Sequence, residues 1–253
     1  MPRLRFLFFG DSLTQRGFEL GGWGAGMTDL YRRTADITLR GFGGYNTRCA
    51  LHIADDIFPP SAPQPAELVT LWFGANDAAV PDRLGGPQHI PIEEYKQNLL
   101  RLIQKIREHG TTYIILLTPP PVGDSARIQH NTQRHGDIEA ARVPDRTREH
   151  SGLYAAACRE VAHRSSLPVV DLWTGLQEYI GWEATFFNDG LHFNRDGQQA
   201  VLKLLLEVLD SNIPQLKADK LVPDYPKMED LDFQNLDKSF AEHAKLHGSA
   251  SSA

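Results

Sequence analysis

The chain has 253 residues, of which 41% are apolar, and this is enough for one large hydrophobic core followed by a tail. Its formal net charge of −6 provides no basic field, which argues against nucleic acid or an anionic membrane surface as a partner. We therefore expect a small partner that is not strongly anionic. No apolar run reaches the roughly 20 residues of a membrane span, and the apolar stretch before Asp11 is too short for a signal sequence. These features predict a soluble, cytoplasmic protein without stable membrane insertion.

Short apolar runs, each interrupted by Gly or Pro, predict buried β-strands in several parts of the chain. These runs are LRFLFF at 4–9, the apolar part of ELVTLWFGAND at 67–77, TYIILLTPPP at 112–121 and, more weakly, LPVVDLW at 167–173. The segments between them have helical periodicity. In residues 92–110 one face is apolar and the segment closes on Gly110, which is typical of an amphipathic helix. The residues of that face are Tyr95, Leu99, Leu102, Ile103 and Ile106. Residues 154–164 and 197–209 have the same character.

Strands that alternate with helices predict an α/β fold, in which a mainly parallel, five-stranded sheet lies in a three-layer α/β/α sandwich of the flavodoxin-like type. Ligands of such folds bind at the carboxyl ends of the strands. Residues 1–210 form the predicted domain. Residues 211–253, rich in Pro, Lys and Asp and ending in GSASSA, are expected to form a partly or wholly flexible extension. The polar, Arg-rich stretch 124–150 is a long connection typical of a lid or binding loop.

Polar residues that a core does not need follow two strands and occur once more near the C-terminus. They are Asp11-Ser12, Asn76-Asp77 and the DGLH segment at 189–192. A serine hydroxyl becomes a nucleophile only with a base in hydrogen-bond reach and a third group that orients the base. Asp189 and His192, three residues apart around a glycine, can supply both for Ser12. Donors for the oxyanion are the Ser12 backbone N–H, a glycine of GFGGYN at 41–46 and the Asn76 amide.

Each of these signals also has a purely structural interpretation when it is taken alone. Ser12 follows a strand as helix-capping residues do, and His192 precedes a helix that starts near Asn194. Asn76-Asp77 and Gly43-Gly44 are ordinary turn sequences. The GxSxG nucleophile motif is absent because position 14 is Thr. The occurrence of all of these blocks in one chain, at strand ends or nearby loops, favours a hydrolase.

The blocks GDSLTQ, Gly44, GAND and DGLH resemble the four sequence blocks of the GDSL, or SGNH, hydrolase family. GFGGYNTR, TLWFGANDA, HIPIEEYKQNL, LLTPPP and FNDGLHFNRDGQ extend the resemblance to the isoamyl acetate-hydrolysing esterase subfamily over residues 4 to 210. The resemblance implies the SGNH-hydrolase form of the three-layer sandwich. It also implies Ser12 as nucleophile, His192 as base and Asp189 as its orienting group, with Gly44 and Asn76 completing the oxyanion hole. The chain departs from the subfamily at Gly43, where serine is expected, and over 124–150.

We therefore expect an ester hydrolase that acts on small, short-acyl esters such as acetate esters through an acyl-serine, with water and the ester as its partners. Deacetylation of a sugar and acyl transfer to another alcohol are related activities. Bulky residues near the catalytic blocks are expected to line and shorten the acyl pocket, and these are Trp23, Phe42, Trp72 and Phe73. The oligomeric state stays open, a homodimer included.

Two other classes of function are compatible with some of these residues. A metal-dependent phosphoesterase would use oxygen and nitrogen ligands from Asp11, Asn76, Asp77, Asp189 and His192, although no paired ligand motif is present. A non-catalytic binding module would keep the fold, which an intact triad argues against. The two cysteines lie far apart and outside any CxxC or Cys/His cluster. We therefore expect no cofactor and no metal.

Overall fold

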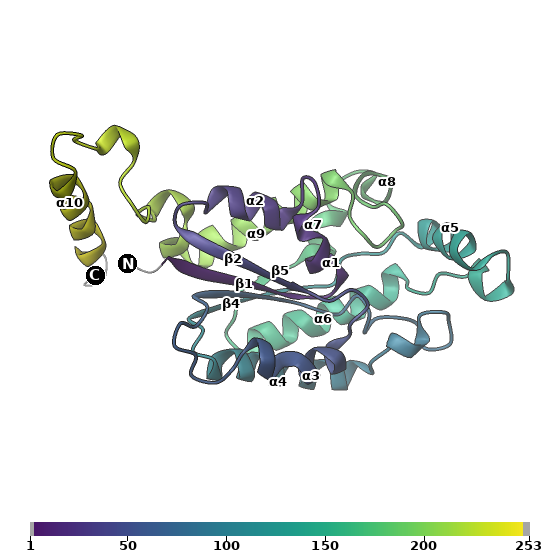
Figure 1. Ribbon diagram of the computed structural model, residues 1–253. Coiled ribbons are helices and arrows are strands. Elements are labelled where there is room, and N and C mark those ends of the chain that lie inside the picture. The colour runs from purple at the N-terminus through teal and green to yellow at the C-terminus, as the bar shows by residue number, and fades with distance from the viewer. Residues whose placement is uncertain (1–2, 250–253) are drawn as a thin grey trace.

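The computed structural model describes residues 3–249, which form a five-stranded parallel sheet between two layers of helices (Figure 1). The strands are β1 (Leu4–Gly10), β2 (Ala35–Gly41), β3 (Leu68–Trp72), β4 (Tyr113–Leu117) and β5 (Val169–Val170). Their order across the sheet is β2-β1-β3-β4-β5, and every neighbouring pair is parallel. The predicted three-layer α/β/α fold is confirmed.

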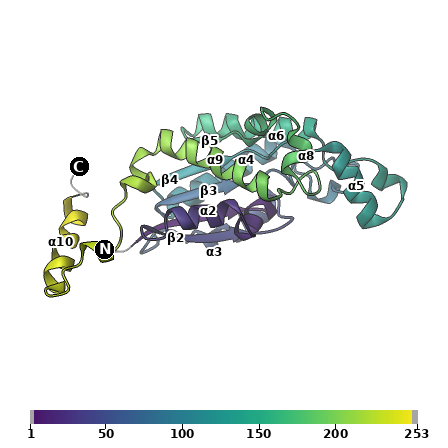
Figure 2. The same cartoon turned by 90° about the horizontal axis from the view of Figure 1, so that it is seen from above.

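Helices cover both faces of the sheet, as parallel strands joined by crossovers require. One layer contains α2 (Trp23–Leu30) and α9 (Arg195–Asn212), and the other contains α3 (Thr47–Ile57), α4 (Ile92–Glu108) and α6 (Arg148–Arg164) (Figure 1). Seen from above, α5 (Asp124–His135) lies beyond one end of the sheet and α10 (Leu236–Ser249) beyond the other (Figure 2). The remaining helices are short: α1 (Ser12–Gln15), α7 (Leu172–Gln177) and α8 (Trp182–Phe186).

The alternation of side chains along β1 creates two separate hydrophobic cores. Phe6 and Phe8 are fully buried in the core beneath α2 and α9, whereas Leu7 and Phe9 point into the core beneath α3, α4 and α6. Successive strand residues face opposite sides of a sheet, so an uninterrupted apolar run is stable only where both faces are covered. The apolar sequence of β1 therefore fixes it as a central strand.

The amphipathic helix predicted at 92–110 is α4, and all five residues of its predicted apolar face are buried. The strand β2 was not among the apolar runs that the sequence analysis identified. In its sequence ADITLRG, polar or charged residues alternate with apolar ones, so no continuous apolar run is present. It forms an edge of the sheet, where one side has no neighbouring strand, and only Ala35 of its seven residues is fully buried. Edge strands need fewer apolar residues, which explains the weak signal.

The segment after α9 contains short 3₁₀ turns and then α10. Helix α9 ends at Asn212, close to the domain boundary predicted at residue 210. That boundary and the flexibility of the extension stay predictions, and the final GSASSA sequence falls partly outside the described residues. Within residues 3–249, no helix has both the length and the apolar character needed to cross a membrane.

Candidate active site

The order of the strands brings three loops together at one edge of the sheet. Parallel strands end at the same edge, and β2, β1 and β3 are neighbours. The loop after β2 carries Gly44, the turn after β1 carries Ser12, and the loop after β3 carries Asn76. Three segments that are distant in sequence therefore line one pocket of about 550 Å³.

Backbone packing positions Ser12 directly after β1. A Cβ atom on residue 10 would lie 2.4 Å from the carbonyl oxygen of Trp72. The end of β1 can therefore pass this close to the backbone of β3 only because residue 10 is a glycine. Asp11 then caps α1, because its Oδ1 accepts a hydrogen bond from the N–H of Leu13 at 2.9 Å. Ser12 is the first residue of this helix and lines the pocket.

The DGLH segment is a closed turn between α8 and α9. An antiparallel bridge joins Phe187 to Phe193, and Asp189 Oδ1 accepts hydrogen bonds from the N–H groups of Leu191 at 3.0 Å and His192 at 2.8 Å. Gly190 has φ of +78°, a left-handed conformation that disfavours other residues. These contacts hold one carboxylate oxygen of Asp189 in the turn and leave the other for the imidazole.

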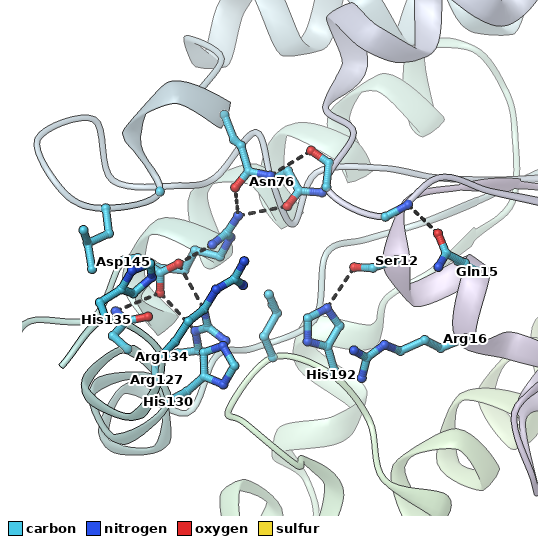
Figure 3. Close-up of a pocket in the computed structure, with 18 residues that line it drawn as sticks. Ser12, Gln15, Arg16, Asn76, Arg127, His130, Arg134, His135, Asp145 and His192 are labelled. Carbon is cyan, nitrogen blue, oxygen red and sulfur yellow. Dashed lines mark hydrogen bonds and ion pairs between the residues drawn. The ribbon is translucent and has the colours of Figure 1, made fainter. Parts of the chain in front are cut away.

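Ser12, His192 and Asp189 form a continuous chain of hydrogen bonds, part of which is seen in Figure 3. The distance from Ser12 Oγ to His192 Nε2 is 2.9 Å, and that from His192 Nδ1 to Asp189 Oδ2 is 2.8 Å. A carboxylate can only accept a hydrogen bond, so Nδ1 carries the proton. In the neutral ring Nε2 is then the acceptor and the Ser12 hydroxyl donates to it.

The electrostatic surroundings keep Asp189 ionised. Burial by itself would raise the pKa of this carboxyl, but the hydrogen bonds from His192 and the nearby Arg127 guanidinium hold the pKa well below its usual value. Arg127 Nη1 lies 3.3 Å from Asp189 Oδ2. An ionised carboxylate stabilises an imidazolium formed at His192, as a general base requires.

The amide of Asn76 has a fixed orientation at the opposite wall. Its Oδ1 accepts from Arg146 Nη2 at 2.9 Å, and its Nδ2 donates to the carbonyl of Tyr45 at 2.8 Å. Two hydrogen atoms are available on Nδ2, so one can still point into the pocket that Asn76 lines.

Two glutamine side chains anchor the glycine loop beside Asn76. Gln15 Oε1 accepts from the N–H of Gly43 at 2.7 Å, and Gln88 Nε2 donates to the carbonyl of Gly44 at 2.8 Å. Gly44 has φ of +82°, in the left-handed region. Gly43, at which the chain departs from the subfamily, thus lies in a loop that hydrogen bonds attach on both sides.

The four bulky residues predicted to line the substrate pocket do not line it, which corrects that expectation. Trp23, Trp72 and Phe73 are fully buried core residues. Phe42 is partly buried and stacks on Tyr45 outside the pocket. Proximity in sequence to the catalytic blocks was misleading, because the side chains of Trp23 and Trp72 point into one core and that of Phe73 into the other.

The sequence analysis missed a buried charge network formed by Arg127, Asp145 and Arg146. Arg127 donates to both carboxylate oxygens of Asp145 at 3.0 Å each, and Arg146 contacts the same carboxylate. All three side chains are at most 7% exposed. Since Arg127 also reaches Asp189 and Arg146 reaches Asn76, the network connects the two walls of the pocket. The Arg-rich composition of residues 124–150 was the available signal.

Metal ligation was the alternative use of the site's carboxylates. Among the described residues, no group of three or more His, Cys, Asp or Glu side chains is arranged to hold a metal ion. Asp11 and Asp77 do not line the pocket and are fully buried, and burial raises the pKa of Asp11 to about 7 and that of Asp77 to about 6.

The Asp145→Asn substitution tests whether the network holds the site together. It leaves two buried guanidinium groups facing a neutral amide, so we expect it to lower the free energy of unfolding by about 3–5 kcal/mol, measured by guanidinium denaturation. Asp137→Asn is the matched control, since Asp137 also binds one arginine, Arg142, through both oxygens but is largely exposed. Its free energy of unfolding should stay close to that of the wild type, because an exposed ion pair contributes little to stability. Equal losses for the two variants would contradict this role of Asp145.

Comparisons with known proteins identify the family of this chain. Residues 8–200 match the GDSL-like lipase/acylhydrolase family. A GDSL esterase/lipase of Arabidopsis thaliana is 41% identical over 96% of this chain and 100% of its own length. An isoamyl acetate-hydrolyzing esterase 1 homolog of Rattus norvegicus is 34% identical over 89% of this chain and 88% of its own length.

Among solved structures, a lipase/acylhydrolase from Enterococcus faecalis superimposes with a TM-score of 0.62 and 22% identity, covering 88% of this chain and 100% of that one. An acetylxylan esterase from Geobacillus stearothermophilus superimposes with a TM-score of 0.63 and 19% identity, covering 81% and 94%. At such identities the two structures support the fold alone. The match over most of the chain shows that the protein belongs to the GDSL-like lipase/acylhydrolase family of serine ester hydrolases.

Proposed function

We propose that the protein hydrolyses small, short-acyl esters such as acetate esters through a Ser12–His192–Asp189 triad. The observation that carries the proposal is the chain of hydrogen bonds of 2.9 and 2.8 Å that joins the three side chains, with Ser12 and His192 lining the pocket. A hydroxyl, a base and an orienting carboxylate in this order are the arrangement that activates a serine for acyl transfer.

The reaction has two halves with the same proton carrier. Ser12 Oγ attacks the ester carbonyl carbon while its proton moves to His192 Nε2. The bond from that carbon to the alcohol oxygen breaks, and Nε2 returns the proton to the leaving alcohol, so that an acyl-serine remains. A water molecule then repeats the sequence, giving its proton to Nε2 and releasing the acid as Ser12 recovers its hydrogen. Asp189 stays ionised throughout and stabilises the imidazolium.

The oxyanion of each tetrahedral intermediate would be held by donors from three strand ends, namely the N–H groups of Ser12 and Gly44 and the Asn76 amide. Arg146 supports this role, because its hydrogen bond to Oδ1 fixes which end of the amide presents its N–H groups to the pocket. Donors that are oriented before the reaction stabilise the developing charge without reorganisation. The roles of these groups are proposals from the geometry and the family resemblance.

The preference for short acyl chains is supported by the composition of the pocket. Among the described residues that line it, only Leu84 and Leu191 have aliphatic side chains. A long acyl chain would find little apolar surface to bury, whereas an acetyl group requires little. The rat homolog, which is 34% identical, is named for the hydrolysis of an acetate ester, isoamyl acetate. The cytoplasmic location expected from the sequence remains a prediction.

The Ser12→Ala variant tests the nucleophile. We expect kcat to fall by about 10³-fold or more with the thermal midpoint preserved, and the Ser12→Ala/His192→Ala double variant to lose little more, because the two side chains act as a unit. Ser125→Ala is the matched control, an exposed serine of α5 that does not line the pocket. An organophosphonate should add to Ser12, as detected by mass spectrometry. Inactivation by EDTA that a divalent ion reverses, with no adduct on Ser12, would favour the metal-dependent alternative.

The Asn76→Ala variant tests the oxyanion hole. Removing one donor among several should lower kcat by about 10²-fold with a smaller change in KM, since the interaction is made mainly in the transition state. Asn98→Ala removes another buried asparagine, which donates to Thr47 Oγ1 and lies outside the pocket, and it should leave kcat within about threefold of the wild type. A loss confined to KM would show that Asn76 binds the ground state instead.

A series of 4-nitrophenyl esters tests the acyl preference. Acetate and butyrate esters should have kcat/KM values at least about tenfold above that of the decanoate ester, because only two of the described residues that line the pocket have aliphatic side chains. Measurements below the critical micelle concentration keep the comparison between free substrates. A kcat/KM that rises steadily from acetate to decanoate would contradict the proposed preference.

A further inference from the structure

Helix α5 buries a polar face against the pocket. Its buried residues are Arg127 and Asn131, whereas a helix packed on a domain normally buries apolar residues. Arg127, His130, Asn131 and Arg134 recur at intervals of three and four, which places them on one side of the helix, and all four line the pocket. The helix therefore contributes hydrogen-bond donors and positive charge to the wall that a substrate would touch.

The buried arginines of the pocket are already neutralised within the protein. Arg127 is paired with Asp145 and lies near Asp189, and Arg146 is paired with the same Asp145. These two carboxylates are therefore occupied by the buried guanidinium groups and by His192. Asp189 Oδ2 also lies 3.8 Å from His130 Nδ1, so both carboxylates already face groups of the protein itself.

Two further arginines line the pocket without such compensation. Arg134 has no ion pair and no side-chain hydrogen bond to any residue that the structure describes. Arg16 has one carboxylate neighbour, Glu19, at 3.9 Å, and both side chains are partly exposed. Such an exposed pair contributes little and is easily exchanged. In Figure 3, Arg16 lies on the side of His192 and Arg134 on the side of α5.

The neighbouring histidine does not change this balance. The pKa of His130 is lowered by burial and by the Arg127 guanidinium, so its imidazole is a neutral hydrogen-bond donor or acceptor at neutral pH. The pocket thus carries a net positive charge although the chain as a whole carries −6. The overall charge led us to expect a partner that is not strongly anionic. The positive charge of the pocket instead favours a substrate that carries an anionic group.

We infer that Arg16 and Arg134 form an anion-binding subsite, and that the preferred substrate is a short-acyl ester whose alcohol part carries a carboxylate. The assignment to the alcohol part follows from the mechanism, because His192 returns its proton to the leaving alcohol and Arg16 lines the same pocket as His192. The inference rests on the proposed ester hydrolysis. Arginine is suited to this role since its planar guanidinium binds a carboxylate through two parallel hydrogen bonds.

A matched pair of esters tests the subsite. 4-Acetoxybenzoate and 4-acetoxybenzamide differ in the charge of the alcohol part, and their rates can be normalised to hydroxide-catalysed hydrolysis. We expect the normalised kcat/KM to favour the benzoate at low ionic strength and the preference to shrink in 0.5 M NaCl, because salt screens exposed charges. Arg16→Gln and Arg134→Gln should each reduce the ratio of the two kcat/KM values by about two- to fivefold.

Two control variants test whether a change in the ratio of the two kcat/KM values arises from the charge of the pocket. Arg134→Lys keeps the charge and should retain most of the preference. Arg101→Gln removes an exposed arginine of α4 outside the catalytic pocket and should leave the ratio unchanged. Because the readout is a ratio within one enzyme preparation, a variant that is partly unfolded still reports it.

The outcomes separate this inference from the function on which it rests. Hydrolysis of both esters with a ratio near one, or with a ratio that neither glutamine variant changes, overturns the anion subsite and leaves the ester hydrolase intact. Failure of the wild-type protein to cleave either ester overturns both. A ratio that favours the benzoate and falls in Arg16→Gln and Arg134→Gln but not in Arg101→Gln supports the subsite.

Discussion

The parallel pairing of β2, β1 and β3 is the constraint on which the site depends. Parallel strands must all end at one edge, so the loops after these three neighbours meet there whatever their separation in sequence. Ser12 can occupy the central position only because Gly10 lets β1 approach the carbonyl of Trp72. The apolar runs that hold the strands between two helical layers therefore also determine where Ser12, Gly44 and Asn76 come together.

The buried charges of residues 127–146 connect this sheet edge to the histidine turn. Asp145 bridges Arg127, which contacts Asp189, and Arg146, which contacts Asn76. Buried charges are costly unless they are paired, and here the two arginines also contact Asp189 and Asn76. The segment that departs most from the subfamily pattern thus contributes structure to the catalytic centre as well as a wall of the pocket.

The character of the pocket wall explains how one fold can select among esters. The aromatic residues closest to the catalytic blocks fill the two cores, and the groups left at the surface of the pocket are largely amides, imidazoles and guanidinium groups. Family membership accounts for the ester-hydrolase chemistry, whereas in our proposal Arg16 and Arg134 select the alcohol part. On this proposal, substrate choice depends on electrostatic complementarity more than on apolar burial.

The sequence by itself determined the α/β class, the central strands, the helix at 92–110 and the ordered GDSL blocks, because apolar periodicity and glycine positions are local properties of the chain. The proposed roles of Ser12, His192, Asp189, Asn76 and Gly44 also came from the sequence and still await the kinetic tests. Only the tertiary structure identified β2, whose edge position tolerates polar residues. Only it separated the buried Trp23, Trp72 and Phe73 from the pocket and paired Arg127 and Arg146 with Asp145. Burial and charge pairing depend on which distant segments pack together, and a local sequence pattern does not contain this information.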